Sequence, residues 1–156
     1  MDFLSIDPGK SGAVVVWEDD VPIHWRQLDV QTRFFDVPTI DMINELYELW
    51  YIDEVVIEQL MDRNIRGQSS IANNTTAVNY GIHIGAAMSY HKPVIAYTAS
   101  AWKTKLDLTK DKETSLDMAR NLYPMCEDDL KLKKNHDLAE ALLIGHYHLI
   151  KKEDEI

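Results

Sequence analysis

The hydrophobic pattern of the chain alternates between short apolar runs and longer stretches of helical periodicity. Five apolar runs have the length of strands: residues 2–7, 12–18, 21–28, 53–60 and 92–98. The first three are separated only by short turns, so they predict an antiparallel meander. Pro22 lacks a backbone donor, which suits an edge strand or the start of a strand.

Four stretches have the pattern of helices: residues 39–50, 69–90, 112–123 and 135–152. In the first, apolar side chains recur from Ile40 to Trp50 at helical spacing, and Thr39 is a candidate N-cap. The last ends in Lys151 and Lys152, whose charges suit a helix C-terminus. This order predicts an α/β fold with a mixed central sheet of about five strands, the first three antiparallel, flanked by helices.

Composition narrows the class of protein. With 156 residues and 46% hydrophobic content, we expect a single domain over residues 1–156. No apolar run reaches the ~20 residues of a membrane span, and the N-terminus lacks a signal-peptide pattern, so we expect a cytoplasmic protein that does not act at a membrane. Cys126 is the single cysteine, which excludes intrachain disulfides and favours a small apolar core side chain.

Charge is distributed unevenly along the chain. The net charge of −10 argues against nucleic-acid binding, because phosphate contacts need lysine and arginine. Residues 61–112, however, carry seven basic side chains against three acidic ones, which is +4 locally and leaves −14 for the rest. Such a chain can bind a polyanion on one face and repel it elsewhere, although a mixed solvated surface remains the alternative.

Four acidic residues fall where the predicted elements can bring them together. Asp7 and Glu58 end apolar strands, where ionisation is unfavourable unless a cation or hydrogen bonds compensate. Asp137 and Glu140 lie three positions apart on the last helix, so both can point the same way. Each has a plainer explanation in isolation: a turn at Asp7, a solvated strand end at Glu58, and charges that favour a first helical turn for the pair.

If that helix packs beside the two strands, four carboxylates converge. Carboxylate oxygens suit Mg²⁺, and two ions ~4 Å apart can activate a water and stabilise the leaving oxygen in phosphodiester hydrolysis. We therefore expect two Mg²⁺ ions per active site, with Mn²⁺ able to substitute. His136 could orient a ligand or a water, but polar surface is the favoured interpretation of His136, His146 and His148, and we do not expect a histidine metal site.

Three motifs resemble a known family. "SIDPGKSGAVV", "VVIEQL" and "NHDLAEALLIGHYH" resemble, in order and spacing, the acidic motifs of the RuvC-like Holliday junction resolvases, members of the ribonuclease H-like superfamily. The resemblance implies that Asp7, Glu58, Asp137 and Glu140 are catalytic metal ligands. It also implies a homodimeric, magnesium-dependent endonuclease that nicks four-way DNA junctions symmetrically.

A basic segment adds to the resemblance. "TASAWKTKLDLTKDKETSLDMARNLYP" is similar to the family's basic segment, in which Lys103 would assist catalysis and Lys112 would contact DNA. Lys105 and Lys110 lie in the same segment and complete this predicted DNA-binding set.

Residues 61–79 form the other predicted DNA-binding segment. Arg63 and Arg66 could clamp phosphates, and three amides, Gln68, Asn73 and Asn74, offer hydrogen bonds to backbone or base edges. An ordinary solvated loop is the alternative. A symmetric junction needs two active sites, so we expect a two-fold dimer whose interface uses the helix from residue 39 or the one from residue 69.

Three departures from the family's pattern are visible. Met61 stands where members can carry an aromatic residue that stacks on junction bases. Glu140 replaces an aspartate typical of the bacterial enzymes, and "LDLTKDKET" lacks an expected glycine-rich stretch. These departures favour a divergent viral or phage-type member.

Other classes share part of this pattern. Actin-like and sugar-kinase ATPases begin with a similar strand, acid and glycine turn, but they pair two such domains, which we do not expect of 156 residues. A related nuclease acting on RNA or RNA·DNA hybrids would share the carboxylates. A non-catalytic branched-DNA-binding protein is the alternative outside enzymes, although four acids at a DNA face oppose binding unless metal neutralises them.

Overall fold

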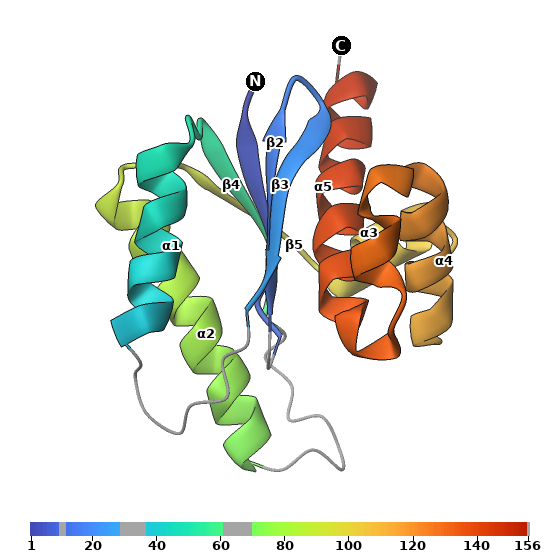
Figure 1. The fold of residues 1–156 in the computed structure, drawn as a ribbon, viewed down its shortest axis with the longest axis horizontal. Helices are drawn as coiled ribbons and strands as arrows, with labels where there is room; N and C mark the ends of the chain where they lie inside the picture. The colour runs from blue at the N-terminus through green and yellow to red at the C-terminus, as the bar shows by residue number, and fades with distance from the viewer. Residues whose placement is uncertain (10–11, 29–36, 61–69, 156) are drawn as a thin grey trace.

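The chain forms a five-stranded mixed sheet with helices on both faces (Figure 1). The computed structural model describes residues 1–9, 12–28, 37–60 and 70–155, and for residues 37–39 and 70–73 it describes the backbone alone. Of the helices in these ranges, none combines the length and apolar character that crossing a membrane requires. Met61, Arg63, Arg66 and Gln68 of the predicted DNA-binding set lie outside the described residues.

The structure confirms the predicted mixed sheet of five strands, the first three antiparallel. The strands are β1 (Phe3–Asp7), β2 (Ala13–Glu18), β3 (Val21–Gln27), β4 (Glu54–Glu58) and β5 (Val94–Tyr97). They lie in the order β3-β2-β1-β4-β5; β1, β2 and β3 are antiparallel, whereas β4 runs parallel to β1 and β5 parallel to β4. Pro22 is on the edge strand β3, as predicted, where a missing N–H is tolerated.

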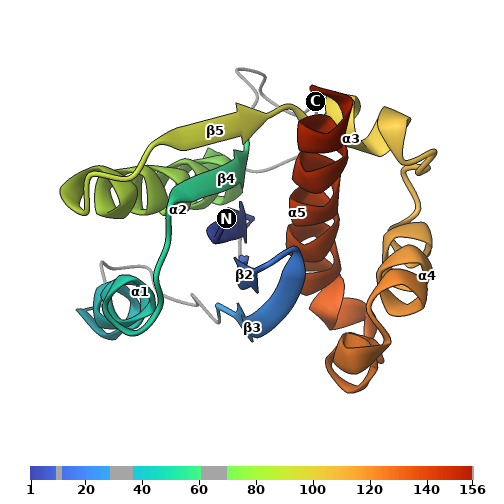
Figure 2. The same cartoon turned by 90° about the horizontal axis from the view of Figure 1, so that it is seen from above.

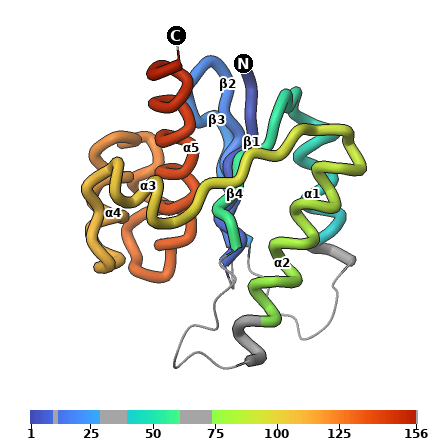
Figure 3. The backbone as a smooth tube through the Cα atoms, turned by 180° about the vertical axis from the view of Figure 1, so that it is seen from behind, coloured from blue at the N-terminus to red at the C-terminus, as the bar shows by residue number. Residues whose placement is uncertain are grey.

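The helices divide into two layers, which Figure 2 shows from above. Helices α1 (Val37–Leu49) and α2 (Ser70–Ser89) cover one face of the sheet, and α5 (His136–Asp154) covers the other. Helices α3 (Ala99–Lys105) and α4 (Lys112–Leu122) lie beside α5, as Figure 3 shows from behind. Two short 3₁₀ helices, η1 (Pro124–Leu130) and η2 (Lys133–Asn135), connect α4 to α5.

Two helix predictions are corrected. Helix α1 already includes Val37, so Thr39 lies inside it and is not its N-cap. Pro38 is accommodated in the first turn, where its missing N–H has no helical partner to lose. Helix α3 was not predicted, because seven residues are too few to establish a helical period; Thr98 caps it by accepting a hydrogen bond from the Ala101 amide at 3.2 Å.

Successive side chains of β1 point to opposite faces of the sheet, so the strand contributes to a hydrophobic core on each face. Leu4 and Ile6 are buried on the side of α1 and α2, whereas Phe3 is buried on the side of α5. The period of two places Ser5 and Asp7 on that second side as well. Ser5 confirms this, because its hydroxyl donates to the Ala141 carbonyl of α5 at 2.7 Å. The acid that ends β1 therefore faces α5.

Helix α5 approaches the sheet closely at Gly145. A Cβ at this position would clash with the indole ring of Trp17, which is fully buried on β2. Trp17 also donates its indole N–H to Ser5 Oγ at 2.8 Å. The missing side chain at Gly145 therefore lets α5 pack directly against Trp17 of β2.

Candidate active site

The four predicted acids come from three elements that meet at one end of the sheet. Asp7 ends β1 and Glu58 ends the neighbouring parallel strand β4, so both lie at the same edge. Asp137 and Glu140 lie in the first two turns of α5, which packs on β1 and β2. The predicted packing of the last helix beside the two strands is therefore what the structure has.

Asp7 is the most buried of the acids, with 4% of its surface exposed. Burial, followed by the negative charges of Asp137, Glu140 and Glu58, raises its pKa well above the ordinary value. The Gly9 amide opposes this by donating to Asp7 Oδ1 at 2.9 Å. A carboxylate in this position is unfavourable in the protein alone, and it becomes favourable when a cation lies beside it.

The turn after β1 holds Asp7 and Asp137 together. The Gly12 amide donates to Asp137 Oδ2 at 3.1 Å, and Gly12 has a φ of +71°, which glycine adopts readily. A Cβ at Gly9 would lie 3.1 Å from Asp7 Oδ1 and 3.6 Å from Asp137 Oδ2. From α2, the Asn79 amide donates to the Gly9 carbonyl at 3.2 Å. Gly9 thus keeps the space beside the two carboxylates free of a side chain, and Gly12 lets the backbone approach Asp137.

Glu58 is held by a tryptophan. The Trp102 indole N–H donates to Glu58 Oε2 at 2.9 Å, and Trp102 itself is fully buried. Burial and the nearby Glu140 raise the pKa of Glu58, although the Lys103 charge and the Trp102 hydrogen bond act in the opposite direction.

Glu140 pairs with two cationic side chains. Its Oε1 atom lies 2.6 Å from Lys103 Nζ and 3.0 Å from His136 Nε2. Burial alone would raise the pKa of Glu140, but these contacts outweigh burial and lower it. Glu140 is therefore ionised at neutral pH, and its charge is balanced by the protein's own groups. Lys103, to which the resemblance assigns a role in catalysis, thus lies beside the acids.

His136 was predicted to be polar surface, which is wrong. Its side chain is 12% exposed, with Nδ1 3.3 Å from Asp137 Oδ1 and Nε2 next to Glu140. Burial would lower the pKa of His136, but the two carboxylates outweigh burial and raise it to about 9. The spacing of four residues between His136 and Glu140 is a sequence signal that could have placed both on one helix face.

The two later histidines were also wrongly assigned to the surface. His148 is 2% exposed, with Nδ1 3.0 Å from the Tyr97 hydroxyl and Nε2 2.9 Å from Glu54 Oε1. His146 is half-buried and lies 2.7 Å from the Tyr123 hydroxyl. Helix α5 turns His148 toward the sheet and His146 toward Tyr123, which directly precedes η1. Both histidines therefore form polar contacts inside the protein. Cys126 is fully buried, as predicted.

The four acids are neighbours, but their carboxylate oxygens do not converge on one point at which a metal ion could bind. Within residues 1–9, 12–28, 37–60 and 70–155, no three acidic, histidine or cysteine side chains are arranged around one point as a metal site. The contacts above give the reason, because Glu58 turns an oxygen to Trp102 and Glu140 turns one to Lys103 and His136. The donor set still fits a hard cation, since it offers only carboxylate oxygens and includes the buried Asp7.

The predicted basic residues are not all equally close to the acids. Lys103 lies at Glu140, and the Lys112 charge is close enough to oppose the raised pKa of His136. Lys105 instead pairs with Asp154 at 3.2 Å, and Lys110 is exposed. Asn74 is exposed on α2; Asn73 belongs to the backbone of α2, and its side chain lies outside the described residues.

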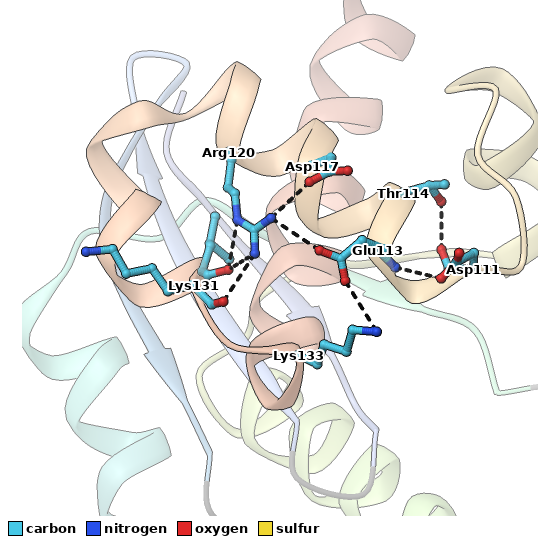
Figure 4. A network of polar contacts seen from close by, with 8 residues as sticks. Asp111, Glu113, Thr114, Asp117, Arg120, Lys131 and Lys133 are labelled. Carbon is cyan, nitrogen blue, oxygen red and sulfur yellow. Dashed lines mark hydrogen bonds and ion pairs between the residues drawn. The ribbon is translucent and has the colours of Figure 1, made fainter.

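The approach to α5 is fixed by Arg120 of α4 (Figure 4). Its Nε and Nη2 atoms donate to the Leu130 carbonyl at 3.0 and 2.6 Å, and Nη1 donates to Asp117 at 2.9 Å. Glu113, at the start of α4, lies 3.5 Å from Arg120 and 3.8 Å from Lys133. Because η2 leads directly into His136 and Asp137, this network positions the beginning of α5.

Comparison with known proteins gives the fold and one related sequence. No protein-family model matches the chain. Over 85 residues, 53% of its length, the chain is 36% identical to the chloroplastic Holliday junction resolvase MOC1 of Chlamydomonas reinhardtii. The match spans 10% of that relative, so the chain covers only a small part of its length.

Two solved structures are similar over nearly the whole chain. RuvC of Thermus thermophilus in complex with a Holliday junction substrate has a TM-score of 0.70 at 20% identity, covering 98% of this chain and 95% of that one. A second Thermus thermophilus RuvC structure has a TM-score of 0.65 at 20% identity, covering 99% and 97%. These similarities confirm the predicted ribonuclease H-like fold.

Proposed function

We propose that this protein is a structure-specific endonuclease that hydrolyses phosphodiester bonds in branched DNA. More specifically, it resolves Holliday junctions by paired, metal-dependent nicks, as a RuvC-like resolvase. The observation that carries the proposal is the burial of Asp7 among three other carboxylates at the end of the central strand. The similarity to RuvC and to part of a Holliday junction resolvase supports this choice of substrate.

Asp7, Glu58, Asp137 and Glu140 would hold the metal, with Mg²⁺ as the expected ion and Mn²⁺ as its substitute. Two such ions, when bound, supply an activated water and charge stabilisation at the leaving oxygen. The protein contributes the rest: the Gly9 and Gly12 amides fix Asp7 and Asp137 by hydrogen bonds, and the packing of α5 on the sheet buries Asp7.

Lys103 and His136 would serve two purposes. Before DNA binds, they balance the charge of Glu140, so a bound cation has to compete with them for that carboxylate. Once released from Glu140, Lys103 Nζ is a donor beside the acids, where it can orient a non-bridging phosphate oxygen. A histidine that keeps its proton at neutral pH can act in the same way.

DNA would approach over the acids, between α2 and the start of α4. Lys103, Lys110 and Lys112 supply positive charge there on a chain of net charge −10. Arg63 and Arg66, which lie outside the described residues, would add contacts to phosphates, and Gln68, Asn73 and Asn74 would add hydrogen bonds to the DNA. Binding that depends on so few cations should weaken as salt rises.

A homodimer would place two active sites on one symmetric junction. The two candidate interfaces are α1 and α2, which cover the face of the sheet opposite α5 (Figure 2). Either interface would leave the acids of both copies accessible, because Asp137 and Glu140 belong to the other layer.

The test compares three labelled substrates: a synthetic four-way junction, a linear duplex and an RNA·DNA hybrid. Each is incubated with wild-type protein or Asp7→Asn, in Mg²⁺ or in EDTA. We expect nicks in the junction alone, only with Mg²⁺ and only with the wild type. Cleavage of the hybrid instead would keep the active site and replace the substrate. Junction binding by the wild type without cleavage of any substrate would leave a DNA-binding protein.

A further inference from the structure

We infer that Trp102 is a positioning residue for Glu58: its indole N–H fixes one carboxylate oxygen so that the other is presented to a cation. The inference rests on the proposed function, because it concerns the metal site of the same endonuclease. Trp102 contacts neither substrate nor metal in this account. It acts through Glu58.

The contact joins two elements that are far apart in the chain. Trp102 Nε1 lies 2.9 Å from Glu58 Oε2, between α3 and the end of β4. Trp102 is fully buried, in a cluster with Leu106, Leu116 and Ala139. The ring therefore cannot turn away without opening the core, and its N–H direction is fixed.

An indole N–H is well suited to this task. It is a donor only, so it cannot rotate to accept a hydrogen bond, and it carries no charge that would repel a metal ion. Glu58 ends its strand, and a glutamate there would otherwise sample several rotamers. A hydrogen bond to Glu58 Oε2 restricts that sampling and leaves Glu58 Oε1 as the oxygen that would bind the cation. Groups that orient a metal ligand in this way typically contribute about 10- to 100-fold in metal affinity.

Helix α3 presents two adjacent side chains to two different acids. Trp102 holds Glu58 of β4, and the next residue, Lys103, reaches Glu140 of α5. Lys103 Nζ also lies 4.9 Å from the centroid of the Trp102 ring. The short helix thus fixes the positions of both acids relative to one another, which is a geometric requirement of any site that shares a cation between them.

Trp17 provides a matched control. It is also fully buried in the same core, and its indole N–H also donates to a side-chain oxygen, Ser5 Oγ, at 2.8 Å. Replacing either tryptophan by phenylalanine removes a buried N–H and part of a ring, so the losses of stability should be similar. Of these two tryptophans, Trp102 donates to a proposed metal ligand, whereas Trp17 donates to a serine.

The experiment measures Mn²⁺ binding by calorimetry, without DNA, for the wild type, Trp102→Phe and Trp17→Phe, with thermal unfolding of each. We expect Trp102→Phe to raise the Kd for Mn²⁺ by about 10-fold or more. Trp17→Phe should destabilise the fold comparably and leave the Kd within about twofold. Adding Trp102→Phe to Glu58→Gln should change the Kd no further, because the positioned carboxylate is already lost.

Equal changes in Kd for the two phenylalanine variants, or no Mn²⁺ binding by the wild type, would overturn the inference. If Trp102→Phe does not fold, benzothienylalanine at position 102 keeps the shape of the ring and removes only the N–H. The outcome is separable from the proposed function. Trp102-dependent Mn²⁺ binding without junction cleavage refutes the resolvase alone, whereas junction cleavage with an unchanged Kd in Trp102→Phe refutes the positioning role alone.

Discussion

Lys103 and Glu140 form an ion pair across the candidate active site, with Lys103 Nζ 2.6 Å from Glu140 Oε1. The two residues belong to different helices, α3 and α5, and Glu140 is buried. The pair therefore links the basic segment of the chain to its last acidic motif. The pair gives Lys103 a structural role beside its proposed catalytic role, and mutation can separate the two.

Lys103→Met should reduce stability and junction cleavage together. It retains most of the apolar stem and leaves His136 as the cationic partner of Glu140 among the described residues, so we expect a loss of about 1–2 kcal/mol in the free energy of unfolding. Cleavage should fall by about 100-fold, because a charged donor next to the reacting phosphate is lost. Denaturant titration and junction cleavage measure the two effects.

A second substitution separates the two effects of Lys103→Met. Combining it with Glu140→Gln removes the unpaired charge, so stability should recover while cleavage stays low. Lys131→Met removes an exposed lysine that pairs with Asp128, and it should change neither quantity measurably. Full cleavage by Lys103→Met would contradict a catalytic role for Lys103.

Asp7→Asn should stabilise the metal-free protein while it abolishes cleavage. Asp7 is buried beside three other acids, which raises its pKa, so the ionised side chain destabilises the fold when no cation is present. Asparagine keeps the shape and removes the charge, for an expected gain on the order of 1 kcal/mol in EDTA at neutral pH. Thermal unfolding in EDTA measures this gain.

The exposed Asp41 on α1 gives the control, since Asp41→Asn should leave the melting temperature unchanged. A lower melting temperature for Asp7→Asn would contradict the electrostatic account.

Gly145→Ala should be strongly destabilising, because its Cβ would clash with the Trp17 indole. The ring is fully buried and cannot yield without moving α5, so we expect a loss of about 2 kcal/mol or more in the free energy of unfolding.

Gly85 on α2 is the matched control: a Cβ there meets no described atom within 4 Å. Gly85→Ala should stabilise by up to about 1 kcal/mol. Equal stability of the two variants, measured by denaturant titration, would show that α5 does not approach the sheet as closely as described.

His83 on α2 should make the fold acid-sensitive. It is 3% exposed, and burial lowers its pKa from 6.5 to about 4. Because the folded-state pKa lies below the unfolded one, its stabilising contribution is complete above pH 6.5 and is lost as the pH falls toward 4. The expected loss is about 3 kcal/mol.

The difference between wild type and His83→Leu isolates this effect, since the carboxylates titrate in both proteins. Free energies of unfolding are measured by denaturant titration at several pH values between neutrality and pH 4. The wild type should lose more stability than the leucine variant on acidification. Parallel pH profiles would contradict the assignment to His83.

The acids could be predicted from the sequence because their positions follow from simple geometry. Asp7 and Glu58 each end an apolar run, and the carboxyl ends of neighbouring parallel strands meet at one edge of the sheet. Asp137 and Glu140 are three residues apart on a helix with an apolar face toward that sheet. Strand ends and helical periodicity were therefore sufficient to bring the four residues together, on the condition that the last helix packs beside the two strands, which it does.

The groups that hold the acids could not be predicted in the same way. In the sequence, Trp102 cannot be told from any other core tryptophan. Helix α3 is too short for its hydrophobic pattern to show which way the Trp102 side chain points. The pairing of Glu140 with Lys103 depends on how two helices pack, which no local pattern records. His136 was misassigned because its partners, Asp137 and Glu140, were themselves interpreted as metal ligands and not as neighbours that would retain its proton.

One measurement tests the central claim most directly: the product formed from a supercoiled plasmid that extrudes a cruciform. A resolvase with two acidic active sites cuts both strands during one encounter, so the plasmid should convert directly to linear DNA in Mg²⁺. A plasmid without the cruciform should remain supercoiled, as should the cruciform plasmid in EDTA or with Asp7→Asn. No cleavage by the wild type in Mg²⁺, or nicked circles formed equally from both plasmids, would contradict the account.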